Sequence, residues 1–219
     1  MKVCCVGYRK WALKIYDFIC SNMPDDDFYI IRNREEYNED KIREYKPDCI
    51  LFYGWSWMVS EKMVDDFECI MLHPSELPRY RGGSPIQNQI INGDLDSAVT
   101  LFVMDGGVDT GDIIAQEFLS LKGHLCEIFE RIYEIGCKLT FDIFNNGYSK
   151  RKQDNLQSTY FPRRRKFQSE ITLEELQTKD SEYLYNKIRM LEDPYPNAFI
   201  RTVDGKRILI KLAELEEEI

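Results

Sequence analysis

The sequence predicts an α/β fold: a mostly parallel sheet with helices on both faces, followed by a small carboxyl-terminal helix and β-hairpin appendage. Short apolar runs at residues 3–7, 28–31 and 48–53 alternate with stretches of helical periodicity, an order typical of parallel sheets. A long amphipathic stretch at 125–146 is suited to cover one face of such a sheet. The 219 residues are 43% hydrophobic, which suits one full domain with a sizeable core.

The chain opens with a strand at residues 3–7 and a helix beginning near Trp11, an order that is Rossmann-like. No G-x-G-x-x-G pattern is present, so the fingerprint of a dinucleotide-binding protein is missing. Tyr8, Arg9 and Lys10 lie in the turn, where the amino end of a helix favours an anion. Arg9 and Lys10 are candidates to bind a substrate phosphate, and the alternative is a solvent-exposed basic turn.

The second and third strands are expected at 28–31 and 48–53, with a short charged helix at 39–45 between them. The third strand is followed by two tryptophans, Trp55 and Trp57. These aromatic side chains either contact a ligand at the end of the strand or pack in the core.

In the stretch 69–120, the residue types are those that a catalytic or ligand-binding site would require. An apolar run ends at His73, one of two histidines, and a loop with two prolines follows, so the loop should lie at the carboxyl end of a strand. This loop carries Ser75, Arg79, Tyr80, Arg81, Gly82 and Gly83. Ser84-Pro85 is a favourable N-cap and first turn for a short helix that Asn92-Gly93 ends.

A further strand is expected at 99–104, and an extended run resumes at Ile113. The turn between them reads Gly106-Gly107-Val108-Asp109-Thr110-Gly111. Its glycines allow backbone to come close to a ligand. His73 and Asp109 are therefore predicted to flank a pocket.

The long helix at 125–146 is expected to end at Gly147, a favourable carboxyl-terminal cap. His124 stands at its start and is expected to be a surface or cap residue rather than a catalyst. Residues 149–169 are polar and basic, and we expect them to form an irregular crossing segment. The basic side chains of this segment either contact a phosphate group of a ligand or face solvent.

The appendage is predicted from helix caps and one turn. Thr172 and Glu175 fit a capping box, Asp180 can cap a second short helix, and Asp204-Gly205 is a favoured turn between two hairpin strands.

Composition disfavours several classes of protein. No apolar run is long enough to span a membrane and the amino terminus shows no secretory pattern, so we expect a cytoplasmic protein. The seven cysteines contain no C-x-x-C pair and lie mostly in apolar runs, which favours reduced core thiols over disulfides or a metal site. The net charge of −9 opposes nucleic-acid binding, because cationic side chains supply most of that affinity.

Roughly residues 47–120 also resemble a known family, most specifically from His73 onward. The pattern His-Pro-Ser-x-Leu-Pro-x-Tyr-Arg-Gly from His73, then Pro-Ile, Gly-Asp and Asp-Thr-Gly-Asp-Ile, is similar to the formyltransferases that use 10-formyltetrahydrofolate. That family includes enzymes acting on methionyl-tRNA, on glycinamide ribonucleotide and on nucleotide sugars. The resemblance implies an N-formyltransferase with 10-formyltetrahydrofolate as co-substrate and no metal. It also implies a formyltransferase catalytic domain at 1–150, followed by the connecting segment and appendage at 151–219.

Under this resemblance His73 and Asp109 are the catalytic pair, since a histidine held by a carboxylate can shuttle a proton and donate to an oxyanion. The expected folate contacts are Tyr53, Gly54, Trp55, Trp57, Val59, Asp105, Gly106, Gly107 and Asp109, with backbone groups of Trp57 and Val59 preferred. The expected substrate contacts are Tyr8, Arg9, Lys10, Ser75, Arg79, Tyr80, Arg81 and Gly82.

One position departs from the family, which places an asparagine two residues before the histidine to bind the formyl oxygen. This chain has Met71 there, and a thioether donates no hydrogen bond. Ser75, Gln87 and Asn88 are nearby residues that carry donors. We expect another donor to have replaced the asparagine, because the rest of the motif is kept.

The leading hypothesis for the substrate is a nucleotide-linked amino sugar, a dideoxy amino sugar in particular, which would serve glycan biosynthesis. It rests on the acidic charge balance, the family motif and the short region after residue 150, where the tRNA enzyme carries a longer domain. The alternatives are another small amine, methionyl-tRNA, or a catalytically reduced folate- or sugar-binding relative. We expect no nucleic-acid or membrane partner, and a homodimer is a family expectation.

Overall fold

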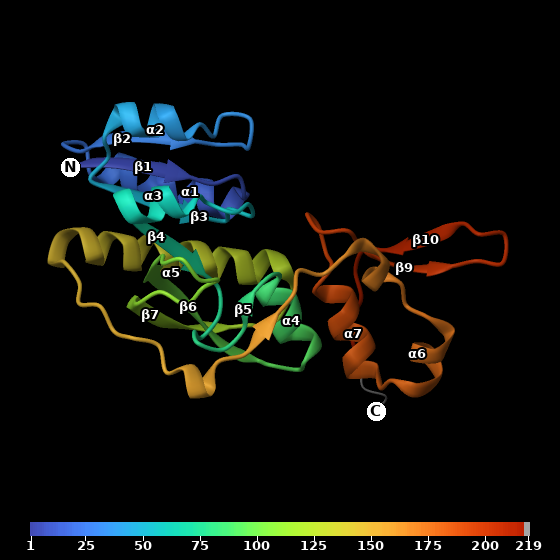
Figure 1. Ribbon diagram of the computed structural model, residues 1–219. Coiled ribbons are helices and arrows are strands. Elements are labelled where there is room, and N and C mark those ends of the chain that lie inside the picture. The colour runs from blue at the N-terminus through green and yellow to red at the C-terminus, as the bar shows by residue number, and fades with distance from the viewer. Residues whose placement is uncertain (217–219) are drawn as a thin grey trace.

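The computed structural model describes residues 1–216 and contains a six-stranded sheet in the order β2-β1-β3-β4-β6-β7 (Figure 1). Its strands are β1 (Lys2–Val6), β2 (Asp27–Ile31), β3 (Cys49–Tyr53), β4 (Glu68–His73), β6 (Asp96–Val103) and β7 (Ile113–Ser120). The first four in this order run parallel, and β6 and β7 extend the sheet antiparallel. The predicted α/β class with a mostly parallel sheet is confirmed.

Helices cover both faces of the sheet, as predicted. α1 (Lys10–Asn22) and α5 (Leu125–Asn146) pack on one face, and α2 (Glu39–Tyr45) and α3 (Glu61–Asp66) pack on the other. Strand alternation separates the two cores, because Val3 and Cys5 of β1 join the first while Cys4 and Val6 join the second. Among the described residues, no helix has both the length and the apolar character needed to cross a bilayer.

The appendage lies beyond α4 (Pro85–Ile91), on the right of Figure 1. It consists of α6 (Leu173–Thr178), α7 (Ser181–Arg189) and the hairpin of β9 (Ala198–Arg201) and β10 (Arg207–Ile210). Both predicted caps are confirmed: the Thr172 hydroxyl accepts from the N–H of Glu175 at 3.1 Å, and the Asp180 carboxylate accepts from the N–H of Tyr183 at 2.8 Å. The division of the chain near residue 150 stays a prediction.

The crossing segment returns to the sheet and lies against the loop that follows β4. It contains two short 3-10 turns, η1 (Asn155–Gln157) and η2 (Lys166–Ser169), and a strand that the sequence did not predict, β8 (Tyr160–Phe161). β8 pairs in parallel with β5 (Arg81–Gly82). A side chain at Gly83 would meet the backbone of Arg163, with Cβ 2.5 Å from its Cα. The glycine therefore permits the close approach of the two segments.

The N-cap positions of α4 and α5 are occupied in different ways. Ser84 and Pro85 occupy the predicted N-cap and first-turn positions of α4, but Ser84 has a φ of 53° and its side chain makes no capping hydrogen bond. The Ser84 hydroxyl accepts instead from the backbone N–H of Arg164 at 3.2 Å, which ties the helix start to the crossing segment. His124 is the N-cap of α5, and its Nδ1 lies 2.6 Å from Oε1 of Glu192, which confirms the expected cap residue.

Replacing Tyr16 by Phe is expected to lower the free energy of unfolding by about 2 to 3 kcal/mol, because each unsatisfied buried polar group costs about 1 to 3 kcal/mol. The buried Tyr16 hydroxyl lies 2.9 Å from the Val6 carbonyl oxygen and 3.0 Å from that of Leu51, and it accepts from the Tyr53 N–H at 2.8 Å. Denaturant titration measures the loss. Tyr53→Phe, which removes one contact of 3.0 Å to Thr140, is the matched control. Equal losses in the two variants would contradict this role.

Candidate active site

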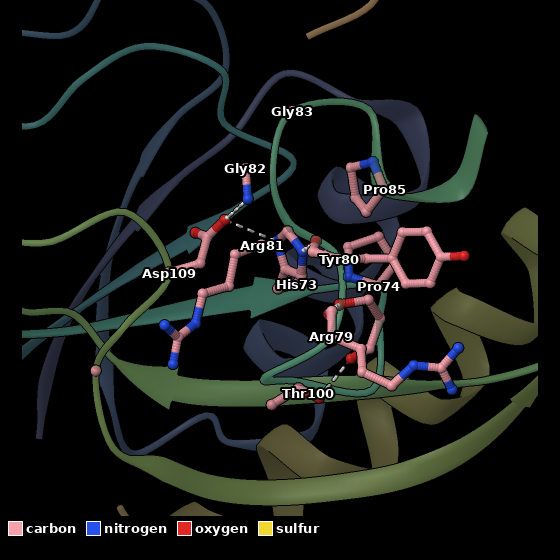
Figure 2. Close-up of polar contacts among 12 residues, drawn as sticks. His73, Pro74, Arg79, Tyr80, Arg81, Gly82, Gly83, Pro85, Thr100 and Asp109 are labelled. Atoms are coloured by element: carbon pink, nitrogen blue, oxygen red, sulfur yellow. Dashed lines mark hydrogen bonds and ion pairs between the residues drawn. The ribbon is translucent and has the colours of Figure 1, made fainter. Parts of the chain in front are cut away.

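His73 ends β4 with both ring nitrogens facing acceptors (Figure 2). Its Nε2 lies 2.8 Å from the carbonyl oxygen of Tyr80, and its Nδ1 lies 3.5 Å from Oδ2 of Asp109. Because a carbonyl oxygen can only accept, Nε2 must carry a hydrogen. In the neutral ring the lone pair is then on Nδ1, the nitrogen that faces Asp109.

Asp109 is held by the loop that follows β4. Its Oδ2 accepts from the backbone N–H of Gly82 at 2.7 Å. Its φ is 53°, a left-handed conformation that is costly for a residue other than glycine and persists only where its surroundings enforce it. The structure thus brings together the two residues that the sequence predicted to flank a pocket.

The predicted substrate loop divides into buried and exposed members. Ser75 is fully buried, and its hydroxyl donates to the carbonyl oxygen of Arg79 at 2.8 Å. The ring of Tyr80 stacks on Phe161 with centroids 4.8 Å apart, so it packs against the crossing segment. The guanidinium of Arg79 is exposed and points away from His73 in Figure 2, toward Asp94 at 3.6 Å. The buried members shape the loop, and their contacts with a substrate stay predictions.

The predicted folate loop after β3 contains both buried and exposed side chains. Tyr53 is fully buried, and Trp55 is 9% exposed and packs in the second core. Gly54 has a φ of 61° and lies against the side chain of Arg9, where a Cβ would come within 2.8 Å. Trp57 is 41% exposed, and Val59 is partly buried against the second core. The use of backbone groups of Trp57 and Val59 for folate stays a prediction.

The second predicted folate loop is ordered by an acidic side chain. Oδ1 of Asp105 accepts from the N–H of Gly107 at 3.0 Å and from the hydroxyl of Thr110 at 2.5 Å. Gly106 has open space around it, since an added Cβ would meet no atom within 4 Å. The turn that carries Asp109 is therefore internally hydrogen-bonded, with free room on one side.

Three cations that lack carboxylate partners in the described chain lie at the start of α1 and in the crossing segment. The hydroxyls of Tyr8 and Ser56 lie 2.7 Å apart, and Nη2 of Arg163 donates to the same Ser56 hydroxyl at 2.6 Å. The guanidinium of Arg9 lies over the ring of Tyr8 at 4.8 Å. Among residues 1–216, no carboxylate comes within 4.0 Å of Arg9, Lys10 or Arg163. We call Arg9, Lys10 and Arg163 the cation cluster.

The cation cluster is only partly visible in the sequence. Arg9 and Lys10 were predicted as substrate contacts, whereas Ser56 was missed and Arg163 was noted only as part of a basic run. No local signal places Arg163 here, because the β5–β8 pairing and the contact with Gly83 set its position.

Met71 occupies the position of the missing asparagine, on the same face of β4 as His73. It packs in a small apolar cluster with Leu77, Phe102, Ile113 and Met104. Of the three predicted substitutes, Ser75 donates to Arg79 and Asn88 donates to the carbonyl of Gly83 at 2.9 Å. Within the described chain, the Nε2 of Gln87 is buried and has no partner, so neither of its two N–H groups is used, whereas one N–H of Asn88 is taken by Gly83.

Restoring the family asparagine with Met71→Asn is expected to leave turnover unchanged or to lower it. The amide would enter an apolar cluster, where an unsatisfied group costs about 1 to 3 kcal/mol. Turnover of the natural protein and of the variant, measured with one amine substrate and confirmed folding, decides the point. A gain of roughly tenfold or more would refute replacement by another donor, because one oxyanion donor supplies about a hundredfold to a thousandfold.

The thiols and acidic groups offer little further chemistry. The seven cysteines are free, and burial raises the pKa of Cys69, which lies in β4, to about 12. Its thiol therefore stays protonated near neutral pH. Over residues 1–216, no group of three or more His, Cys, Asp or Glu side chains is arranged to hold a metal ion.

A family model described as formyl transferase matches residues 14–126, which is just over half of the chain. The chain belongs to this formyl transferase family. The match covers β4, the His73 loop and the turn that carries Asp109. The resemblance that the motif implied is therefore confirmed at the level of the family.

Individual members of the family resemble the chain to different degrees. A methionyl-tRNA formyltransferase from Campylobacter curvus is 34% identical over 180 residues, which cover 80% of this chain and 57% of that protein. The chain thus spans a little over half the length of the curated relatives it matches. A solved methionyl-tRNA formyltransferase from Clostridium thermocellum has a TM-score of 0.85 and 32% identity, covering 96% of this chain and 97% of that one.

A third relative supports the fold alone. The N-formyltransferase from Helicobacter canadensis, solved in complex with folinic acid and dTDP-3-aminofucose, has a TM-score of 0.69 and 24% identity, covering 87% of this chain and 80% of that one. Solved members of both substrate classes therefore share this architecture. Because the Clostridium chain is matched almost in full, the short region after residue 150 does not separate the two classes.

Proposed function

We propose that the chain transfers the formyl group of 10-formyltetrahydrofolate to the primary amine of a nucleotide-linked amino sugar. The observation that carries the chemistry is the pair of the buried His73, at the end of β4, and the partly buried Asp109, in the turn between β6 and β7, with Nδ1 and Oδ2 3.5 Å apart. Membership of the formyl transferase family supports the reaction class.

Formyl transfer needs no enzyme nucleophile, because the substrate amine attacks the formyl carbon directly. The new bond forms between that carbon and the amine nitrogen, while the bond between the carbon and the folate nitrogen breaks. The amine loses a proton and the folate nitrogen gains one. The protein must therefore hold both reactants and move a proton between them.

His73 suits this task through its Nδ1. The carbonyl of Tyr80 fixes the hydrogen on Nε2, so Nδ1 is the atom that takes the proton from the amine. Oδ2 of Asp109 then stabilises the positive imidazolium, and the N–H of Gly82 keeps that carboxylate in place. When the imidazolium returns the proton to the folate nitrogen, the enzyme regains its starting protonation.

The cation cluster supports a substrate that carries phosphate. Its three side chains lack carboxylate partners among the described residues, although the protein has a net charge of −9. The paired phosphates of a nucleoside diphosphate match such a small cluster. A nucleic acid presents phosphates over a longer path and is bound tightly only when many cations neutralise them. We therefore favour a nucleotide sugar as the substrate.

Methionyl-tRNA is the second candidate substrate. It is favoured by the relatives named for it, which are 34% and 32% identical to this chain and so more similar than the sugar enzyme described above. Both candidates place a primary amine at His73 and differ only in what lies beyond the amine.

The proposal is tested by turnover with 10-formyltetrahydrofolate and three acceptors: dTDP-linked amino sugars, UDP-linked amino sugars and methionyl-tRNA. Mass spectrometry of the acceptor identifies the formylated product. We expect a formylated nucleotide sugar. Formylation of methionyl-tRNA alone would overturn the sugar assignment and keep the transfer chemistry. If no acceptor is formylated and calorimetry detects no binding of a stable folate analogue, the whole proposal fails.

Sedimentation of the same preparation tests the expected homodimer.

A further inference from the structure

Gln153, in the crossing segment, joins the two loops that carry the candidate active site. Its Nε2 donates to the carbonyl oxygens of Asp109 at 2.9 Å and Gly111 at 2.7 Å. Its Oε1 accepts from Nε and Nη2 of Arg81 at 3.0 and 2.8 Å. One side-chain amide therefore makes four hydrogen bonds, two to the turn that carries Asp109 and two to the loop that follows His73.

We propose that Gln153 is a positioning residue that holds Asp109 in its catalytic conformation, an inference that rests on the proposed formyl transfer. The φ of 53° at Asp109 is costly unless its surroundings impose it. Gln153 holds the backbone carbonyl of Asp109, while the N–H of Gly82 holds its carboxylate. Arg81 and Gly82 are the two residues of β5, so both restraints end on the same short strand.

The direction of the Gln153 amide is set by its charged partner. Arg81 is 8% exposed, and its guanidinium carries only donors, so the oxygen of the Gln153 amide must face it. The amide nitrogen is then directed at the two carbonyls of the turn. Nη2 of Arg81 also donates to Oδ1 of Asn155 at 2.9 Å, which fixes the guanidinium from a second side. The arrangement leaves Gln153 one orientation that satisfies all its partners.

The backbone of the crossing segment is anchored next to Gln153. Arg151 and Ile113 exchange two backbone hydrogen bonds of 2.8 Å at the start of β7. The amide therefore reaches the Asp109 turn from a fixed point on the sheet, so its hydrogen bonds can restrain the turn.

The test compares Gln153→Ala, Gln153→Glu and the control Gln157→Ala. Gln157 is an exposed glutamine in the same segment whose amide donates only to Asp154, at 3.2 Å. Glutamate keeps the acceptor that faces Arg81 but lacks the N–H groups that hold Asp109 and Gly111. We expect both Gln153 variants to lose about ten- to a hundredfold in kcat, with little change in KM, because a small displacement of a catalytic group costs on this scale. Gln157→Ala should match the natural protein.

Two further measurements separate positioning of Asp109 from general support of the fold. In the Asp109→Asn background, adding Gln153→Ala should lower kcat less than twofold, since the residue acts through the Asp109 carboxylate. Amide hydrogen exchange at residues 105–111 should be faster in both Gln153 variants than in Gln157→Ala. Wild-type kcat in Gln153→Glu, or unchanged exchange in this turn, would overturn the inference. The exchange result stands even if no acceptor is formylated, so it distinguishes failure of this inference from failure of the proposed reaction.

Discussion

Asp109→Asn and His73→Asn are each expected to lower turnover about a hundredfold or more, because positioned acid–base groups usually contribute that much. Asparagine at position 109 keeps an oxygen that can accept from the N–H of Gly82, which lies 2.7 Å from Oδ2. It removes the negative charge that faces Nδ1 of His73 at 3.5 Å. The loss should therefore appear in kcat while the melting temperature changes little.

The other histidine provides the matched control for this prediction. His124 is the N-cap of α5, and its Nδ1 lies 2.6 Å from Oε1 of Glu192. Glu192 follows α7 in the appendage, so this contact does not involve the His73 loop. His124→Asn should therefore keep turnover near that of the natural protein, although it loses stability. Initial rates of formylated product, with folding checked by circular dichroism, measure all three variants. Near-normal turnover in both His73→Asn and Asp109→Asn would remove the pair from the mechanism.

The sequence predicted that His73 and Asp109 flank one pocket because each follows a predicted strand. In the structure β6 runs antiparallel to β4 and its last residue, Val103, pairs with Ile70, so the two strands do not end at the same edge of the sheet. The turn that follows β6 nevertheless brings Asp109 to the His73 loop, where its carboxylate accepts from the N–H of Gly82. The strands themselves were predictable, since β1 and β3 are short apolar runs bounded by polar turns. The caps at Thr172 and Asp180 were predictable for a similar reason, because each is a local interaction within one turn of helix.

Features that depend on contacts between distant segments were not predictable in this way. Ser84 has the residue type of an N-cap, yet its contact with Arg164 and its left-handed φ override that preference. Gln153 is one polar residue among many in the crossing segment, and only the fold reveals its four hydrogen bonds to Arg81, Asp109 and Gly111. By contrast α3 was missed although a local signal existed: Ser60 accepts from the N–H of Met63 at 3.2 Å, as an N-cap does.

Gly111→Ala is expected to lower turnover by about a hundredfold, because a displacement of about 1 Å in a catalytic group costs on that scale. An added Cβ would overlap the carbonyl oxygen of Val103 and lie 2.9 Å from its carbonyl carbon. That obstacle is backbone at the end of β6, which cannot rotate out of the way as a side chain can. The turn must shift instead, and Asp109 lies two residues earlier in it.

The same shift should weaken the folded state, since the carbonyl of Gly111 accepts from Gln153 at 2.7 Å and the next residue, Asp112, accepts from the N–H of Val103 at 2.9 Å. Gly111→Ala should therefore lower the melting temperature as well as kcat. Gly106→Ala is the control for stability, because its methyl group would meet no atom within 4 Å, and its melting temperature should stay that of the natural protein. If Gly111→Ala instead kept both melting temperature and kcat, the turn would have room to absorb a methyl group without moving Asp109. The close packing against Val103 would then not be what fixes the carboxylate opposite His73.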